Sequence, residues 1–215
     1  MHIENLFKKL SNNRPNLIYL SGKTCTGKST FARRLQDQLG YASIELDNVV
    51  KDCIIKPFHL EDQEGTVFVE VYRNGQNQQW LQAFVQGTRH LIDQNLTKHQ
   101  PLVIDGAVAN SKTLAAIFEG HDFTFVYFHP QILDNYVRNL TARFMSSSTN
   151  FSAGLPKRFW PYIDAKEFEK FSSSRHLTPS IEDSIKQYAR SSHAESVQRQ
   201  LEFQAHFDNV VVVQI

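Results

Sequence analysis

The segment around residues 17–39 constrains the fold of this chain more than any other. It opens with a short apolar run, Leu17-Ile18-Tyr19-Leu20. The run leads into a glycine-bounded octapeptide, Gly22-Lys23-Thr24-Cys25-Thr26-Gly27-Lys28-Ser29. Apolar residues then recur at helical spacing and stop before Gly40: Phe31, Ala32, Leu35 and Leu39. The sequence therefore predicts a buried strand, a glycine-rich turn and a helix in immediate succession.

The octapeptide has the spacing G-x-x-x-x-G-K-S, which suits binding of phosphate. Glycines let the backbone adopt conformations closed to other residues, so that several amide N–H groups can point at one anion. In this pattern Lys28 supplies charge for the β- and γ-phosphates, and the Ser29 hydroxyl is a ligand for Mg²⁺. The start of the helix, including Thr30, adds the positive end of its dipole. A fortuitous glycine-rich turn is the alternative, but the strand before it and the helix after it favour a P-loop that binds ATP or GTP with Mg²⁺.

Composition places this motif in an ordinary setting. The chain has 215 residues, 23 Lys plus Arg against 22 Asp plus Glu, and a formal charge of +1, so charge does not favour a nucleic-acid partner. Two cysteines, Cys25 and Cys53, form no disulfide framework and fit a reducing compartment. The first ten residues predict a short amphipathic helix without the features of a signal peptide, and no apolar stretch is long enough to span a bilayer. We expect a cytoplasmic protein.

Strands and helices alternate along the chain. Apolar runs predict further strands at 42–46, 101–106, 123–128 and 210–213, and helical spacing predicts helices at 111–118, 131–145 and about 180–206. A mostly helical section occupies about 48–100. Continuous apolar strands separated by helices are typical of a parallel sheet covered on both faces. We expect one α/β domain over residues 1–215, a three-layer sandwich around a five-stranded parallel sheet.

Carboxylates follow two of the predicted strands, where ligands bind in sheets of this kind. Glu45 and Asp47 end the second strand at i and i+2, hence on one face while the strand continues. Asp47 is our candidate to orient or deprotonate an acceptor hydroxyl, and an N-cap of the next helix is its alternative role. Asp105 ends the third strand, so it competes with Glu45 for the Mg²⁺ shell and has the better claim. A simple turn at Asp105-Gly106 is the alternative.

These residues together resemble the P-loop small-molecule kinases. That superfamily includes nucleoside monophosphate, shikimate and gluconate kinases, chloramphenicol phosphotransferase and the zeta-type toxins. The resemblance implies the strand order 2-3-1-4-5 and a contact between Asp47 and the acceptor hydroxyl. Glu45-x-Asp47 is similar to the Asp-x-Asp of shikimate kinases, with glutamate in place of the first aspartate.

The resemblance also implies a lid. A Ser-rich stretch with Phe and Pro, residues 146–162, interrupts the pattern and is expected to close over the nucleotide. Arg143, at the end of the preceding helix, is the position we carry over as a catalytic arginine, and Arg138 as a nucleotide-binding one. A solvated helix face is the alternative for both. Lys157 and Arg158, within the stretch, are weaker candidates.

The acceptor itself is expected to bind in the section from 48 to 100. This section offers six candidate side chains, most of whose aromatics are expected in the core rather than the pocket: Phe58, Phe68, Tyr72, Arg73, Trp80 and Arg89. Adenylate kinases follow their third-strand Asp-Gly with Phe-Pro-Arg, whereas Asp105-Gly106 runs into Ala-Val-Ala-Asn, so a nucleoside monophosphate acceptor is not supported.

Three functions remain open at this point. The first is a phosphotransferase that moves the γ-phosphoryl group to a hydroxyl of a small molecule, with Lys28, Asp47 and Arg143 as its catalytic residues. The second is a nucleotide-dependent switch or motor, which the absence of an Asn-Lys-x-Asp motif disfavours. The third is a kinase that acts on a nucleic-acid end, which the neutral charge disfavours.

Overall fold

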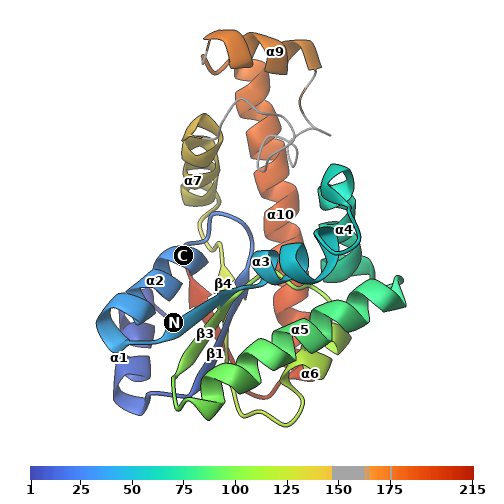
Figure 1. The fold of residues 1–215 in the computed structure, drawn as a ribbon. Helices are drawn as coiled ribbons and strands as arrows, with labels where there is room; N and C mark the ends of the chain where they lie inside the picture. The colour runs from blue at the N-terminus through green and yellow to red at the C-terminus, as the bar shows by residue number, and fades with distance from the viewer. Residues whose placement is uncertain (147–162, 164, 175) are drawn as a thin grey trace.

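The chain folds around a five-stranded sheet in which all neighbouring strands are parallel (Figure 1). The computed structural model describes residues 1–146, 163, 165–174 and 176–215. The strands are β1 (Leu17–Gly22), β2 (Ala42–Glu45), β3 (Leu102–Asp105), β4 (Thr124–His129) and β5 (Val210–Gln214). Their order is β2-β3-β1-β4-β5, so the predicted fold class and strand order are confirmed.

Helices connect the strands. They are α1 (Ile3–Asn13), α2 (Lys28–Leu39), α3 (Leu46–Val50), α4 (Glu64–Val69), α5 (Gln78–Thr97), α6 (Ser111–Phe118), α7 (Leu133–Ser146), α9 (Ala165–Ser174) and α10 (Pro179–His206). Between α3 and α5 the chain also forms three short turns of other helix types, η1 (Lys51–Ile55), η2 (Glu61–Gln63) and η3 (Glu70–Asn74). The predicted helical section of residues 48–100 is therefore present.

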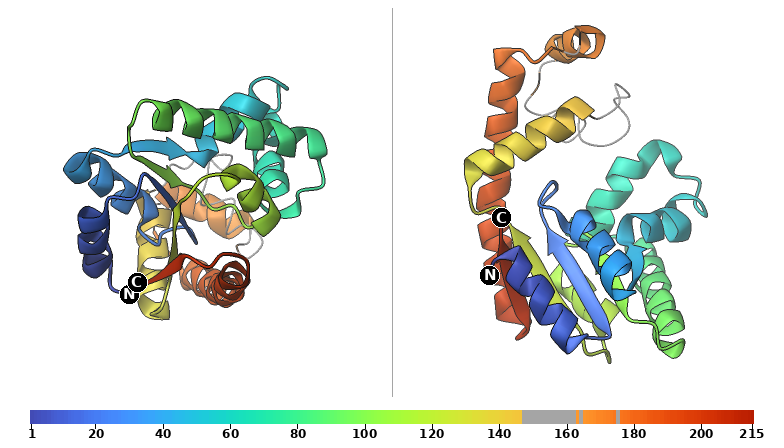
Figure 2. Two further views of the ribbon diagram at one scale, coloured as in Figure 1. Left: turned by 90° about the horizontal axis from the view of Figure 1, so that it is seen from below. Right: turned by 90° about the vertical axis from the view of Figure 1, so that its left-hand side faces the viewer.

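Two apolar layers enclose the sheet, because alternate side chains of each parallel strand point to opposite faces. Ile18, Leu20 and Val103 pack with α1 and α2 on one face. Tyr19, Ile104 and Phe125 pack on the other face, in the cluster that includes α5, α6 and the end of α10. Figure 2 shows the sheet between these layers.

A pair of helices rises above the carboxyl edge of the sheet. α7 and α10 run side by side there, and α9 lies at their far end (Figures 1 and 2). A third apolar cluster joins them, built on Tyr136, Leu140 and Phe144 of α7 with Phe171 of α9 and Ile185 of α10. The section from α3 to η3 lies on the other side of the P-loop (Figure 1). The loop after β1 therefore lies between two helical walls.

Two sequence expectations need adjustment, and a third lies mostly outside the described residues. β2 ends at Glu45, one residue earlier than predicted, and α3 begins at Leu46, before the predicted start of the helical section at about residue 48. Asp47 therefore belongs to a helix and not to the strand face of Glu45. The helix α9 was not predicted, because the sequence analysis assigned no element between the stretch 146–162 and the helix from about 180. Of the predicted lid, residues 146–162, all but Ser146 lie outside the described residues, as do Lys157 and Arg158. Within the described ranges, no helix is long and apolar enough to cross a membrane.

Gly22 allows a test of the close approach of β1 to β4. Its φ is +137°, and a Cβ placed there would lie 2.4 Å from the carbonyl oxygen of Phe128 on β4. We expect Gly22→Ala to lose roughly 1–3 kcal/mol of unfolding free energy from backbone conformation alone, and more from the collision. Urea denaturation measures the loss.

Gly120→Ala is the matched control for this substitution. Gly120 has a φ of +80° but open space around the position of a Cβ. It carries the conformational cost without the collision, so its loss should be the smaller one. Equal losses for the two variants would contradict the close approach of β1 and β4.

Candidate active site

The P-loop adopts the conformation of a phosphate cradle. Gly22, Cys25 and Gly27 have φ values of +137°, +64° and +85°. Backbone in this left-handed region alternates with ordinary backbone to turn successive N–H groups toward one point. Gly27 is the N-cap of α2, which begins at Lys28, so the unpaired N–H groups of its first turn face the same space. The local geometry fits an anion such as a triphosphate.

Hydrogen bonds inside the loop hold this shape. The Thr26 hydroxyl, which is buried, donates to the carbonyl oxygen of Lys23 at 2.7 Å. The Lys28 ammonium group donates to the same carbonyl at 2.8 Å. Cys25 packs against the cluster of α7 and α10, which fixes the tip of the loop. Thr24 and Thr30 complete the predicted nucleotide-binding segment, Thr30 with its side chain exposed.

Ser29 and Asp105 meet at the base of the loop. The Ser29 hydroxyl donates to a carboxylate oxygen of Asp105 at 2.5 Å. Burial raises the pKa of Asp105, while the charge of Lys28 and the hydrogen bond from Ser29 act in the opposite direction and Asp47 adds to the rise. Lys28 and both carboxylates therefore share one electrostatic environment.

The Ser29–Asp105 pair fits a magnesium ion. Mg²⁺ in nucleotide sites takes one or two oxygen ligands from the protein and completes its shell with phosphates and water. A hydroxyl and a carboxylate at the foot of a phosphate cradle are such a donor set. In the described part of the chain no group of three His, Cys, Asp or Glu side chains could hold a metal ion by itself.

Asp47 lies in the first turn of α3, where Tyr72 of η3 reaches it. The Tyr72 hydroxyl donates to a carboxylate oxygen of Asp47 at 2.8 Å. Burial raises the pKa of Tyr72 well above its ordinary value, and the charge of Asp47 adds to the rise, so Tyr72 stays a hydrogen-bond donor. The N-cap position of α3 is Glu45, without a side-chain cap bond, so the alternative role of Asp47 as an N-cap is wrong.

Glu45 and Asp105 are register partners on β2 and β3. Glu45 is exposed, however, and its carboxylate accepts a hydrogen bond from the Asn48 amide at 3.3 Å. The expected shared face of Glu45 and Asp47 does not exist, because the strand ends between them. Of the two candidates for the metal, Asp105 is the one that contacts the P-loop.

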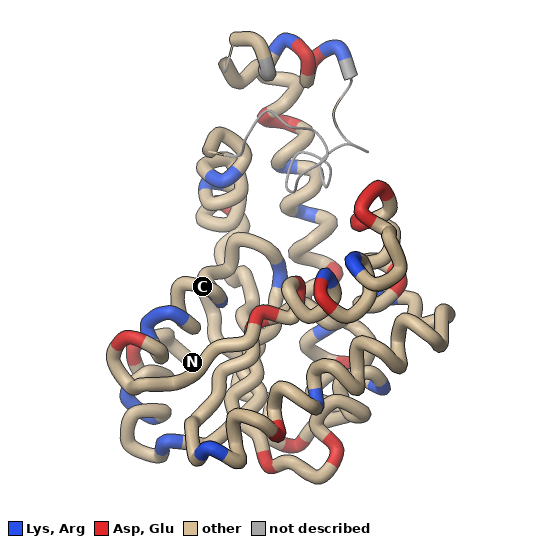
Figure 3. Tube along the Cα trace, viewed as in Figure 1, with Lys and Arg blue, Asp and Glu red and all other residues tan. Residues whose placement is uncertain are grey.

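The two predicted arginines lie on different sides of α7. Five residues separate Arg138 from Arg143, which is about 140° around a helix of 3.6 residues per turn. Arg138 and two basic residues of α10 line a groove of about 270 Å³ between the helices, whose lining is Leu133, Asp134, Val137, Arg138, Lys186 and Arg190. The side chains of Arg138 and Arg143 are exposed, and Arg138 donates to the Asn135 amide oxygen at 3.1 Å. Figure 3 shows basic residues on both rising helices.

Most of the aromatic candidates for the acceptor site belong to the core, as expected. Tyr72 is buried, and Phe68 and Trp80 are half-buried against the main cluster. Phe58 is exposed. Arg89 of α5 donates to the carbonyl oxygen of Ala116 and pairs with Glu119, so it joins α5 to α6. Arg73 is exposed on η3 beside Tyr72.

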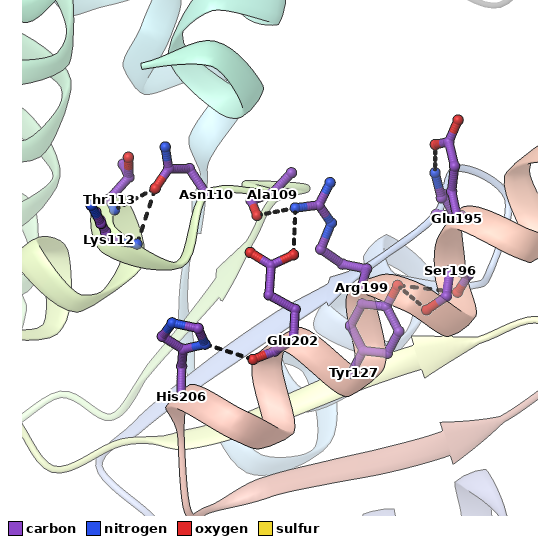
Figure 4. Close-up of polar contacts among 11 residues, drawn as sticks. Ala109, Asn110, Lys112, Thr113, Tyr127, Glu195, Ser196, Arg199, Glu202 and His206 are labelled. Atoms are coloured by element: carbon purple, nitrogen blue, oxygen red, sulfur yellow. Dashed lines mark hydrogen bonds and ion pairs between the residues drawn. The ribbon is translucent and has the colours of Figure 1, made fainter. Parts of the chain in front are cut away.

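Sequence reasoning missed the contribution of α10. Glu195 forms an ion pair with Lys23 of the P-loop. One turn further along, Arg199 donates to the carbonyl oxygen of Ala109 and pairs with Glu202 at 3.2 Å (Figure 4). No motif marks these positions; only their i, i+4 spacing on one polar helix face could have suggested a common role.

A buried polar group anchors α10 where these residues lie. The Ser196 side chain is fully buried against β4, 3.1 Å from the Tyr127 hydroxyl and 3.0 Å from Nδ1 of His129 (Figure 4 shows Ser196 and Tyr127). Burial lowers the pKa of His129, and His193 lowers it further, so the imidazole is held neutral. The contacts of Ser196 with β4 therefore fix the position of Glu195 and Arg199 along the sheet.

The family comparison agrees with this geometry. The family model AAA_33, described as an AAA domain, matches residues 17–143, from the start of β1 to Arg143 on α7. The chain belongs to this family. Its domain is P-loop kinase-like, as in kinases of the zeta-toxin and chloramphenicol phosphotransferase type. Domains of this family bind nucleotide, generally with Mg²⁺.

Other comparisons add little to the family assignment. The comparison with curated proteins finds no match. Among similar solved structures is an uncharacterized protein from Eubacterium ventriosum, 10% identical, with 93% of this chain and 88% of that chain covered and a TM-score of 0.42. A likeness that low carries no argument, so the fold assignment rests on the sheet order and the P-loop.

The buried carboxylate of Asp105 generates a prediction on stability. Its pKa is raised from 3.8 by burial, so the native state binds the proton more tightly than the unfolded state and stability falls as pH rises through that window. Asp105→Asn removes the titratable group, so this loss of stability with rising pH should disappear. We expect its melting temperature without nucleotide to exceed that of the wild type by a margin that grows between about pH 4 and pH 7.

Asp37→Asn is the control for this prediction, because Asp37 is exposed on α2. Its melting temperature should follow that of the wild type across the same pH range. Differential scanning calorimetry of the three proteins makes the comparison. A constant difference between Asp105→Asn and the wild type would show that Asp105 is not held at a raised pKa.

Proposed function

We propose that this protein is an ATP-dependent phosphotransferase that moves the γ-phosphoryl group to a hydroxyl of a small molecule. The observation that carries the proposal is the convergence of Lys28, Asp105 and Asp47 at one sheet edge, where β1 leads into the P-loop and α2, β3 ends at Asp105, and β2 leads into α3. A switch needs only the cradle and the metal position. The additional carboxylate of Asp47, held by Tyr72, supports an acceptor.

The donor half of the site would use the P-loop. Its N–H groups and Lys28 bind and orient the phosphates of ATP, or of GTP in the same way. Ser29 and Asp105 would hold Mg²⁺, which when bound neutralises developing charge on the phosphates. In this assignment Glu45, the register partner of Asp105 on β2, would belong to the outer shell of the ion. Arg138 would contact the nucleotide.

The acceptor half would use Asp47. Its carboxylate accepts the proton of the acceptor hydroxyl as that oxygen bonds to the γ-phosphorus and the bond from phosphorus to the β–γ bridging oxygen breaks. Asp47 thus ends protonated and ADP leaves with the bridging oxygen. Arg143 would stabilise charge on the transferred group, and the section 146–162 would close over it as a lid, within one domain of residues 1–215.

Lys28→Ala tests the donor half. We expect it to lose Mg·ATP binding and to lower turnover of ATP by at least about a hundredfold, because it removes the ammonium group that the P-loop directs at the β- and γ-phosphates. Isothermal titration with Mg·AMP-PNP and an ADP-release assay are the measurements. Lys56→Ala is the control, since Lys56 pairs with Asp52 on the surface. Wild-type turnover by Lys28→Ala would refute the assignment.

Asp47→Asn and Tyr72→Phe test the acceptor half. Asp47→Asn should keep Mg·AMP-PNP affinity and lose acceptor-stimulated turnover by about 10²–10⁴-fold, the usual contribution of a positioned base. Tyr72→Phe removes a hydrogen bond worth about 1 kcal/mol of stability and should lower turnover less. Tyr41→Phe is matched to it, because the Tyr41 hydroxyl also donates once, to Pro15, at a distance from Asp47.

The acceptor screen separates this proposal from its competitors. Sugars, nucleosides, aminoglycosides and hydroxy acids are scored for ADP release by the wild type and for loss of that release in Asp47→Asn. Release stimulated by RNA or DNA ends instead would indicate a nucleic-acid kinase. Two nucleotide-dependent conformations with no acceptor response would indicate a switch.

A further inference from the structure

One side chain of α10 contacts the P-loop from a distant part of the sequence. Glu195 accepts a hydrogen bond from the Lys23 ammonium group, and the two charges form an ion pair. The Lys23 side chain is 18% exposed and that of Glu195 is 51% exposed. Burial lowers the pKa of Lys23, and the hydrogen bond and charge of Glu195 oppose this effect. Removal of Glu195 would therefore take the carboxylate away from a largely buried ammonium group, which is costly.

Neighbouring strands fix the positions of both partners. Lys23 directly follows β1, and β1 pairs with β4 along the sheet. Glu195 precedes Ser196, which is fully buried and lies 3.1 Å from the Tyr127 hydroxyl of β4 (Figure 4). Two anchored partners lose less conformational freedom when they meet than two long side chains on an open surface. This ion pair can therefore contribute more than an ordinary surface salt bridge.

The backbone of Lys23 connects the ion pair to the lysine that serves the phosphates. Its carbonyl oxygen accepts hydrogen bonds from the Lys28 ammonium group at 2.8 Å and from the Thr26 hydroxyl at 2.7 Å. Lys28 is thereby held within the loop, where the motif directs its charge at the β- and γ-phosphates. A Lys23 peptide of fixed orientation keeps that ammonium group in place, so less conformational freedom is lost when a nucleotide binds.

Glu195 also lies outside the part of the chain that matches the family. The family model covers residues 17–143, whereas α10 spans Pro179–His206. The family match therefore assigns no role to Glu195, although this residue contacts the loop that defines the family.

We propose that Glu195 is a positioning residue of the nucleotide site, which holds Lys23 and, through the Lys23 carbonyl, orients Lys28 toward the phosphates. Glu195 touches neither the nucleotide nor the reacting atoms in this assignment. The inference goes beyond the proposed phosphotransferase, because it concerns nucleotide binding and needs no acceptor.

Calorimetric titration with Mg·AMP-PNP tests the inference through the dissociation constant. Glu195→Ala should weaken binding about tenfold, the effect of losing one charge-assisted hydrogen bond. Glu195→Gln keeps an oxygen acceptor without the charge and should weaken binding less. Unchanged or tighter binding by Glu195→Ala would overturn the inference, because Glu195 would then be a bystander or would only repel the phosphates.

A second substitution shows whether Glu195 acts through Lys23. Lys23→Met removes the ammonium group and keeps the backbone carbonyl that holds Lys28. In this background we expect Glu195→Ala to have no further effect on the dissociation constant, because the interaction that it removes is already absent. A further loss of about tenfold would overturn the inference, since Glu195 would then act by another route.

Turnover separates a positioning role from a loss of folded protein. Release of ADP is measured as a function of ATP concentration. Glu195→Ala should raise the KM for ATP about tenfold and keep kcat within about twofold, because saturating nucleotide draws Lys28 to the phosphates in both proteins. A lower kcat at unchanged KM is the result of a smaller folded fraction, and that outcome would overturn the inference.

Glu182→Ala is the matched control, because Glu182 is an exposed glutamate of the same helix. Its dissociation constant for Mg·AMP-PNP and its KM for ATP should equal those of the wild type. Weakening as large as that of Glu195→Ala would indicate a general effect of charge on α10 and would overturn the inference. Circular dichroism verifies that each variant is folded. Failure of the acceptor screen would refute the proposed function and leave the comparison of dissociation constants unaffected.

Discussion

The parallel register of the central strands is the constraint on which the site depends. β1 pairs with β3 so that Leu20 lies opposite Asp105, and with β4 so that Gly22 lies opposite Phe128. Because all five strands run in one direction, every loop that follows a strand opens at the same edge. The phosphate cradle and the carboxylate of Asp105 are therefore neighbours, although 76 residues separate Ser29 from Asp105 in sequence.

Burial of charge gives this edge its chemistry. A carboxylate removed from water is costly unless partners compensate it, and Asp105 is compensated by Ser29 and by the charge of Lys28. This hydroxyl and carboxylate are the pair that we propose for Mg²⁺. On the side of the P-loop where α3 lies, Tyr72 stays protonated because it is buried and faces Asp47, so it can position that carboxylate only as a donor.

α10 ties the two halves together. Its Glu195 contacts the donor loop, its Arg199 contacts the loop after β3, and that loop contacts Tyr72. Ser196, between them in sequence, is fixed on β4 by buried hydrogen bonds. The N-terminal part of the same helix pairs with α7 above the sheet edge.

Sequence patterns predicted the elements with local signals. Contiguous residues specify the P-loop with its flanking strand and helix, and likewise the strand that ends in Asp105. The structure has these elements where they were expected. The prediction that Asp47 lies on the same face as Glu45 was wrong, because β2 ends at Glu45 and a helix begins at the next residue. A difference of one residue in such a boundary changes the direction in which a side chain points.

The residues of α10 had no such signal. Its polar face repeats charged residues at helical spacing, which describes any solvated helix as well as one that faces a site. Glu195 and Arg199 acquire their roles from the packing of α10 on β4, a contact between segments about 67 residues apart. Periodicity cannot specify which of several exposed-looking positions another loop will cover.

By itself, then, the sequence determined the sheet, the phosphate cradle and the nucleotide-binding class of the domain, because each depends on short runs whose backbone and hydrophobic preferences are local. Only the tertiary structure decided which carboxylate contacts the P-loop, how Tyr72 holds Asp47, and that Glu195 and Arg199 of α10 reach the P-loop and the loop after β3. Those relations are set by strand register and helix packing, which bring together groups that no local pattern connects.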